Sequence, residues 1–180
     1  MNNKALEKLG YGIYLITSKD DKQDNGCITN SVMQVTSGEV KIVVALNKWN
    51  LTHDMIMQSK KFNISILTED TTFAFIQRFG FLSGRDCDKF KDYPHVERGK
   101  NGLLYVTDCT NAYLSAQVLE TIDVGSHTLF IAEVTDAQAF SDAPSATYAY
   151  YHSNIKAKST VVPEKKGELD CHKKSEGAYA

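Results

Sequence analysis

Apolar and polar residues alternate along most of the chain, which predicts β-strands separated by turns and a few short helices. The clearest succession spans residues 43–67, VVALNKWNLTHDMIMQSKKFNISIL. A β-branched run leads into a polar junction at residues 47–50, Leu51 and Met55 then recur at helical spacing, and a second β-rich run follows. This succession predicts a strand, a tight junction, a helix and another strand.

Three β-rich runs occupy residues 103–140, and Gly125-Ser126 provides the turn between the last two. Near the N-terminus, residues 9–18 predict a first strand, and residues 20–26 predict the polar turn that follows it. Long antiparallel strands with little helix between them indicate a barrel or a sandwich rather than a doubly wound sheet.

A short amphipathic helix is predicted over residues 71–79, TTFAFIQRF. A threonine can cap its start and Gly80 can stop it, since these residue types favour the two ends of a helix. Phe75, Ile76 and Phe79 are expected to face inward.

Two other segments allow more than one interpretation. Residues 85–102 are charged and contain proline and glycine, which predicts an exposed connection. Such a long irregular stretch is either a plain solvated loop, a lid over a ligand or part of a subunit contact. The cluster of Tyr148, Tyr150 and Tyr151 can cover a ring system, or it can simply pack, for example at a dimer seam.

A polar strand is predicted over residues 26–37. Its period of two places Ile28, Asn30, Val32 and Gln34 on one face and Thr29, Ser31, Met33 and Val35 on the other. Neither face is cleanly apolar. Such a strand beside a core either wastes hydrogen-bonding groups or directs them at a ligand with many polar edges.

The junction at residues 47–50 has the chemistry of an anion site. Asn50 or Thr52 can serve as the N-cap of the following helix, whose first N–H groups then lie near the Lys48 ammonium and the Asn47 amide. These groups together suit a phosphate. A plain capped helix with Lys48 in solvent explains the same residues, so local sequence alone leaves both interpretations open.

Taken in order, these segments resemble the flavin reductase-like family, whose fold is the FMN-binding split barrel. The resemblance covers about residues 8–155 and is carried by the runs TNS at 29–31, QVTS at 34–37, VALNK at 44–48, LTHDMI at 51–56, FNISIL at 62–67, FG at 79–80, SG at 83–84, DKF at 88–90, GSHTLF at 125–130 and YAYYH at 148–152. Flavin reductase domains fused to rubredoxin share the Tyr-Tyr-His ending at residues 150–152. Many members have a Pro-Pro pair where this chain has GEV at 38–40.

The resemblance implies a mainly β fold with short helices, an antiparallel split β-barrel that forms a homodimer and binds FMN non-covalently at the subunit seam. The implied cofactor-binding residues are Thr29, Asn30, Ser31, Leu46, Asn47, Lys48, Thr52, Ser83, Gly84 and His127. Lys48, Asn47 and the helix start around Thr52 would hold the phosphate. Residues 29–31 would hold the pyrimidine edge, and His127 would lie beside the isoalloxazine ring. No catalytic side chain is implied, because the flavin carries the chemistry.

The implied function is that of an oxidoreductase that passes a hydride from NAD(P)H to bound FMN and electrons onward to free flavin or to a carrier such as rubredoxin. Two alternatives stay open. One is an FMN-bearing electron carrier without its own nicotinamide site, which nothing in the sequence argues against. The other is a small barrel that binds a ligand without a cofactor, which the charge and the lack of an aromatic and basic stripe disfavour.

Composition supports one soluble domain. The 180 residues are 42% hydrophobic, which suffices for a substantial core over residues 1–155. A net charge of -2 gives no case for nucleic acid, and no apolar run reaches the roughly 20 residues that cross a membrane. The N-terminus lacks the pattern of a signal peptide, so a cytoplasmic location is expected. The lysine-rich residues 156–180 are expected to be a flexible tail, either inert or able to dock an acidic partner.

The cysteines at positions 27, 87, 109 and 171 form no Cys-x-x-Cys pair, which argues against a metal site or a redox dithiol. Cys27 flanks the predicted polar strand. It has no basic neighbour in the sequence that would lower its pKa, so an idle thiol is expected.

Overall fold

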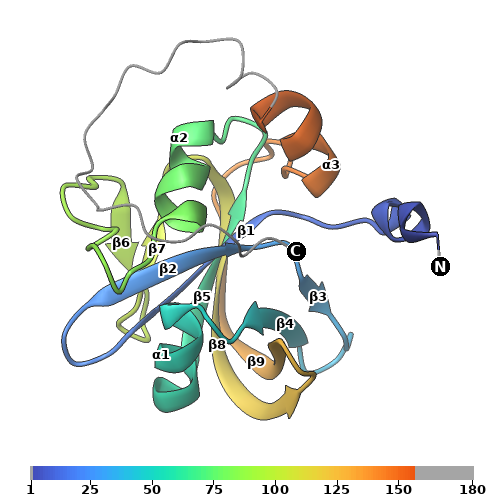
Figure 1. The fold of residues 1–180 in the computed structure, drawn as a ribbon. Coiled ribbons are helices and arrows are strands. Elements are labelled where there is room, and N and C mark those ends of the chain that lie inside the picture. The colour runs from blue at the N-terminus through green and yellow to red at the C-terminus, as the bar shows by residue number, and fades with distance from the viewer. Residues whose placement is uncertain (1, 157–180) are drawn as a thin grey trace.

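A seven-stranded antiparallel sheet organises the computed structural model, which describes residues 2–156 (Figure 1). The predicted tail therefore lies outside the described residues except for Lys156. The strand order is β2-β1-β5-β8-β9-β4-β3. The strands are β1 Tyr14–Lys19, β2 Asp24–Thr29, β3 Val32–Gln34, β4 Lys41–Asn47, β5 Lys61–Leu67, β8 Thr110–Asp123 and β9 His127–Ala139. A separate two-stranded sheet pairs β6 Val96–Arg98 with β7 Leu104–Val106.

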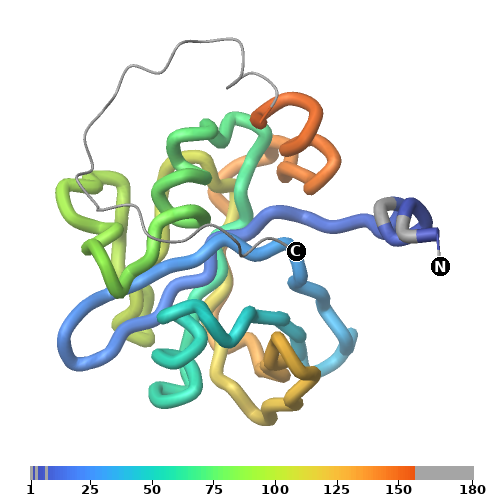
Figure 2. Tube along the Cα trace, in the orientation of Figure 1, coloured from blue at the N-terminus to red at the C-terminus, as the bar shows by residue number. Residues whose placement is uncertain are grey.

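The helices are short and lie around this sheet. They are η1 Asn3–Lys8, α1 Leu51–Ser59, α2 Phe73–Ile76 continuing as η2 Gln77–Phe81, and α3 Tyr148–Tyr150 continuing as η3 Tyr151–Lys156. The first of them stands apart from the rest of the fold in the trace (Figure 2). Among the described residues, no helix is long and apolar enough to cross a membrane.

The two edges of the sheet are joined by a very short link. β2 and β3 lie at opposite ends of the strand order, yet only Asn30 and Ser31 separate them in the chain. In a flat sheet of seven strands, gaps of about 4.8 Å would place these edges about 29 Å apart. The three Cα–Cα steps from Thr29 to Val32 span at most about 11 Å. The sheet must therefore curl until its edges meet, which confirms the predicted split barrel.

The curled sheet separates two hydrophobic cores. On β1, Ile16 enters the core inside the barrel, where Ile56 of α1 also packs. The neighbouring Leu15 faces the other way, into a second core that contains Phe75 and Phe79 from α2 and η2. Because successive side chains of a strand point to opposite faces, β1 is buried on both sides.

The central prediction for residues 43–67 is confirmed. β4 ends at Asn47, α1 begins at Leu51 with Asn50 as its N-cap residue, and β5 begins at Lys61. Lys60 adopts a left-handed conformation with φ of 58°, which ends the helix and turns the chain into β5. The choice between Asn50 and Thr52 as N-cap is thus settled, since Thr52 is the second residue of the helix.

The prediction of one continuous polar strand over residues 26–37 is wrong, because this segment forms parts of two strands. The chain bends at residues 30–31, and β2 and β3 belong to opposite edges of the sheet, so the expected alternation of faces does not continue across the bend. The predicted first strand begins later, at Tyr14, because Gly12 makes only an isolated bridge to Thr147.

The predicted polar turn and helix also have different bounds. The turn is shorter than expected because the Asp20 carboxylate accepts the N–H groups of Lys22 and Gln23, each at 2.8 Å, and β2 then begins at residue 24. The helix predicted over residues 71–79 does bury its three apolar side chains. It does not stop at Gly80, however, because a π turn carries it to residue 81.

Candidate functional site

The predicted site residues converge on the start of α1 from several elements. Asn47 at the end of β4 is paired with His127 at the start of β9. The next residue, Lys48, donates its backbone N–H to the carbonyl of Ser126 at 3.1 Å. The hairpin turn that the sequence predicts at residues 125–126 therefore lies directly beside the β4–α1 junction.

The link between the sheet edges borders the same junction. The N–H of Ala45 on β4 donates to the carbonyl of Ser31 at 3.0 Å, and the Thr29 hydroxyl donates to the carbonyl of Ala45 at 3.1 Å. Within the link, the Ser31 hydroxyl donates to the amide oxygen of Asn30 at 2.8 Å. Residues 29–31 are half-buried, so their polar groups border the site and remain partly open to solvent.

The third side of the site is the loop at Ser83 and Gly84. The Asn25 amide on β2 donates to the Thr52 hydroxyl at 3.0 Å, and Gln23 donates to the carbonyl of Gly84 at 3.2 Å. A Cβ atom at Gly84 would lie 2.2 Å from the Asn25 side-chain oxygen. The lack of a side chain at this glycine thus lets the loop approach α1 through Asn25, a residue that sequence reasoning did not single out.

Two of the predicted contacts cannot be made by side chains. Leu46 is buried in the barrel core, because β4 alternates and Leu46 lies on its inward face. Thr52 is fully buried, and its hydroxyl already accepts a hydrogen bond from Asn25. Each residue can therefore offer a ligand only its main chain.

The first turn of α1 has the features of an anion site. The Asn50 side chain makes no capping hydrogen bond. The N–H of His53 donates to the carbonyl of Asn50 at 3.1 Å, which leaves the N–H groups of Leu51 and Thr52 to face a ligand. Lys48 stands just before this turn, but its ammonium is paired with the Asp123 carboxylate at 2.6 Å. The hydrogen bond from Lys48, together with one from the N–H of Gly125, holds the pKa of Asp123 below its usual value. Asp123 is therefore an anion that would compete with a phosphate for Lys48.

Asn47 and His127 are only partly engaged within the chain. The Asn47 side-chain oxygen accepts the N–H of Trp49 at 2.9 Å, which leaves the amide NH₂ as its ligand donor. His127 is half-buried, and its Nδ1 lies 2.9 Å from the Ser126 hydroxyl. The neighbouring Trp49 is 82% exposed, and no local pattern predicted that so large an aromatic side chain would be left uncovered.

A chain of polar contacts that sequence reasoning missed crosses the site. Arg85 contacts the Asp54 carboxylate at 2.6 Å, and the other oxygen of Asp54 lies 3.0 Å from Nδ1 of His53. Nε2 of His53 lies 2.9 Å from the Thr128 hydroxyl. His53 had no sequence signal that separates it from an ordinary helix residue, because each of these partners is distant in the chain or inconspicuous.

The connection over residues 85–102 is largely exposed, as predicted, but one buried side chain anchors it to the barrel. Lys89 is buried, and its ammonium donates to the carbonyls of Gly26 at 2.8 Å and Phe79 at 3.0 Å. The expectation that Cys27 has no basic neighbour is wrong, since this ammonium acts on its thiol. Burial raises the pKa of Cys27 more than the ammonium lowers it, so the thiol stays protonated at neutral pH.

Other candidates for a site have less support. Tyr151 is buried in the second core, and Tyr148 and Tyr150 pack against that core, so this cluster packs within its own chain. No group of three or more potential metal ligands occurs within residues 2–156.

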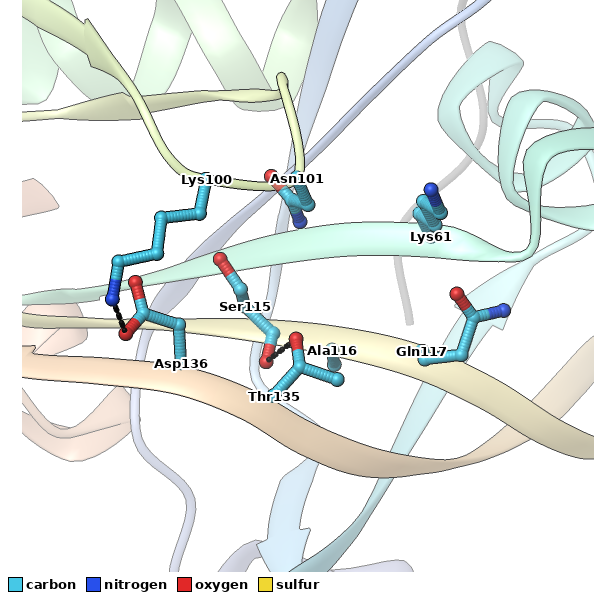
Figure 3. A pocket seen from close by; sticks show the side chains of 8 residues that line it. All are labelled: Lys61, Lys100, Asn101, Ser115, Ala116, Gln117, Thr135 and Asp136. Atoms are coloured by element: carbon cyan, nitrogen blue, oxygen red, sulfur yellow. Dashed lines mark hydrogen bonds and ion pairs between the residues drawn. The ribbon is translucent and has the colours of Figure 1, made fainter.

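A hollow of about 260 Å³ lies away from the predicted site, on strands β5, β8 and β9 beside the β6–β7 turn (Figure 3). Lys100 spans part of it to reach Asp136 at 3.0 Å. Its lining consists of Lys61, Lys100, Asn101, Ser115, Ala116, Gln117, Thr135 and Asp136. None of the predicted flavin contacts lines this hollow, so it gives no support to a flavin there.

Sequence comparison identifies the family. Residues 6–159 match the model of the flavin reductase like domain. The chain is 43% identical over 152 residues to a high molecular weight rubredoxin from Moorella thermoacetica, covering 84% of this chain and 66% of that protein. It is 41% identical over 159 residues to a ferric-chelate reductase (NAD(P)H) from Archaeoglobus fulgidus, covering 88% of this chain and 94% of the relative. The resemblance drawn from the ordered motifs is confirmed.

Solved structures share the fold. An FMN-binding protein from Thermus thermophilus with bound p-hydroxybenzaldehyde superposes with a TM-score of 0.67 at 18% identity, covering 75% of each chain. An NADH:FAD oxidoreductase from Streptomyces globisporus C-1027 gives a TM-score of 0.71 at 17% identity, covering 81% of this chain and 85% of that one.

The close approach at Gly84 gives a test of this packing. We expect Gly84→Ala to lower the free energy of unfolding by about 1–2 kcal/mol, because the new methyl group must displace Asn25 and break its bond to Thr52. Gly38→Ala is the control, since a Cβ there meets nothing within 4 Å. Equal thermal unfolding curves for the two variants would show that the loop does not pack on Asn25 in this way.

Proposed function

The chain belongs to the flavin reductase like domain family, and we propose that it is an FMN-dependent oxidoreductase that takes a hydride from NAD(P)H and passes electrons to free flavin or to an electron-carrier protein. The single observation that carries the proposal is the convergence of Lys48, the uncapped first turn of α1 and the polar link at residues 29–31. The flavin, when bound, supplies the hydride-accepting and electron-transferring chemistry. The side chains of this site bind and orient.

The donor set of the site fits a flavin mononucleotide. The Lys48 ammonium and the first N–H groups of α1 would hold the phosphate, where hydrogen bonds to a charged group contribute about 1.5–3 kcal/mol each. The half-buried polar groups of Asn30 and Ser31 would hold the polar edge of the ring, and the Asn47 amide offers a further donor. The name of the Thermus neighbour supports FMN, whereas that of the Streptomyces neighbour speaks for FAD in a related fold.

The names of two relatives support the proposed electron partners. A nicotinamide donor is supported by the name of the Archaeoglobus reductase. An electron-carrier acceptor is supported by the Moorella relative, of whose length this chain spans 66%. Rubredoxin or a similar carrier is therefore the protein partner that we propose.

We further propose that the site lies at a homodimer seam. Directly paired residues of antiparallel strands share a face, so the outward side of β4 and β9 carries the pairs Val43–Ile131, Ala45–Leu129 and Asn47–His127. The flanking strands extend this apolar face, since Met33 of β3 pairs with Val43 and Ile122 of β8 pairs with Leu129. Both flanking side chains are exposed. A second copy of the chain is the occupant that would bury this face next to the predicted flavin contacts.

Titration with FMN tests the proposed function. We expect the protein to quench the fluorescence of added FMN and, once loaded, to oxidise NAD(P)H in the presence of free flavin. Quenching without NAD(P)H oxidation would favour the carrier without a nicotinamide site. If FMN and FAD both fail to bind, the proposed function is wrong.

The phosphate contact is tested by comparing FMN with riboflavin. Lys48→Ala should weaken FMN by roughly tenfold or more and leave riboflavin nearly unchanged, because only FMN carries the phosphate. Asp123→Asn should tighten FMN roughly twofold, because it releases the Lys48 ammonium from its competitor. Equal losses for both ligands in Lys48→Ala would place this lysine elsewhere in the site.

Sedimentation tests the seam. We expect a dimer, and we expect Met33→Lys to weaken dimerisation by roughly tenfold or more, because it would bury an unpaired charge at the proposed contact. Met57→Lys is the matched control, because Met57 is an exposed methionine on α1 and not on the β3–β4–β9–β8 face. A monomer that still binds FMN tightly would contradict the seam.

A further inference from the structure

The polar chain Arg85–Asp54–His53–Thr128 joins two sides of the site through the first turns of α1. It begins in the loop directly after Gly84 and ends on β9 directly after His127. Both neighbours are predicted flavin contacts, and they approach the start of the helix from different elements. The contacts at 2.6, 3.0 and 2.9 Å form a continuous path between them.

Chemistry sets the direction of the hydrogen bonds to Asp54. Partial burial tends to raise the pKa of Asp54, but hydrogen bonds from His53 and Arg85 outweigh it and hold this pKa below its usual value. Asp54 is therefore a carboxylate, which can only accept, so Nδ1 of His53 carries a proton and donates to it. On the other side of the ring, Nε2 shares a hydrogen bond with the Thr128 hydroxyl at 2.9 Å.

The two ends of the polar chain differ in their exposure to solvent. His53 and Thr128 are 7% and 5% exposed, and the His53 ring also packs edge-on against Phe130 at 5.5 Å between centroids. Arg85 and the Asp54 carboxylate are about half exposed, so their ion pair by itself contributes little. The buried hydrogen bond fixes the orientation of the imidazole, and the exposed pair extends the chain to the loop.

We propose that the polar chain Arg85–Asp54–His53–Thr128 is a positioning device. It holds the Gly84 loop and the start of β9 at His127 at a fixed separation across the start of α1. The proposal rests on the proposed function, because these two elements are its flavin contacts. Thr128 points inward and His127 outward on successive positions of β9. The bond from Thr128 to His53 therefore sets the position of the backbone that presents His127. His53 and Asp54 act through these neighbours and are positioning residues.

A nucleophilic role for the same residues does not fit the structure. The order carboxylate, imidazole, hydroxyl matches that of a hydrolase triad. However, the Thr128 side chain is buried, so it does not present its oxygen to a substrate. Positioning is the role that the burial allows.

The test compares riboflavin and FMN binding among variants at both ends of the polar chain. Thr128→Val should raise the Kd for riboflavin and FMN equally, by about fivefold, because it removes one buried hydrogen bond and leaves the phosphate contact intact. Thr128→Ser should restore binding to within about twofold, since it keeps the hydroxyl. Arg85→Gln should raise both Kd values about twofold, consistent with a half-exposed ion pair.

Arg98→Gln is the matched control for the exposed end. Arg98 also pairs with a carboxylate, Asp24, at 2.8 Å, and its side chain is as exposed as that of Arg85, at 50% against 48%. It contacts none of the predicted site residues through this pair. We expect the flavin Kd to be unchanged in this variant.

The double variant Arg85→Gln/Thr128→Val tests whether the contacts of the polar chain act together. Once Thr128 is removed, the further loss of Arg85 should have no added effect on Kd, because the path to β9 is already broken. If the double variant raises Kd by the product of the two single fold-changes, the contacts act independently and the proposal is overturned. Lowered thermal stability with unchanged Kd in Thr128→Val would also overturn it, because the hydroxyl would then serve the fold alone.

The failure of this proposal is distinguishable from that of the proposed function. If the unsubstituted protein binds no flavin, the function is wrong. If it binds flavin and Arg85→Gln binds it as tightly as Arg98→Gln does, the positioning chain is wrong. The Arg85 comparison is informative even if Thr128→Val fails to fold, because both arginines are at the surface.

Discussion

The two-residue link between the sheet edges is the constraint on which the rest of the structure depends. Because Asn30 and Ser31 must bridge opposite edges of a seven-stranded sheet, the sheet curls, and the link lands against Ala45 on β4. That contact brings polar groups from the link to the junction where β4 turns into α1. The short connection that joins the sheet edges thus also borders the candidate site. The candidate site therefore forms only when the sheet curls.

Side chains along β4 and β9 point alternately inward and outward, so the two faces of these strands have different roles. Inward residues such as Leu46 and Phe130 fill the barrel core. Outward residues form an apolar face that ends in Asn47 and His127. A single chain leaves this face partly exposed beside the helix start.

The sequence predicted elements whose signals are local and missed contacts that are not. The change of period around residues 47–50 located the β4–α1–β5 unit, because strand and helix patterns are read from neighbouring residues. The bend at residues 30–31 has no glycine or proline to mark it. The pairs Lys48–Asp123 and His53–Thr128 each join residues 75 positions apart, and no local pattern records such a contact. The family resemblance supplied the candidate site residues but not the contacts of their side chains.

The ammonium of Lys89 constrains how the connection after η2 can move. It is held by the carbonyls of Gly26 and Phe79, so it couples this connection to β2 and to the end of the π turn. Swinging the connection outward would break both of these hydrogen bonds. One buried lysine therefore opposes movement of residues 85–93 away from the edge of the sheet.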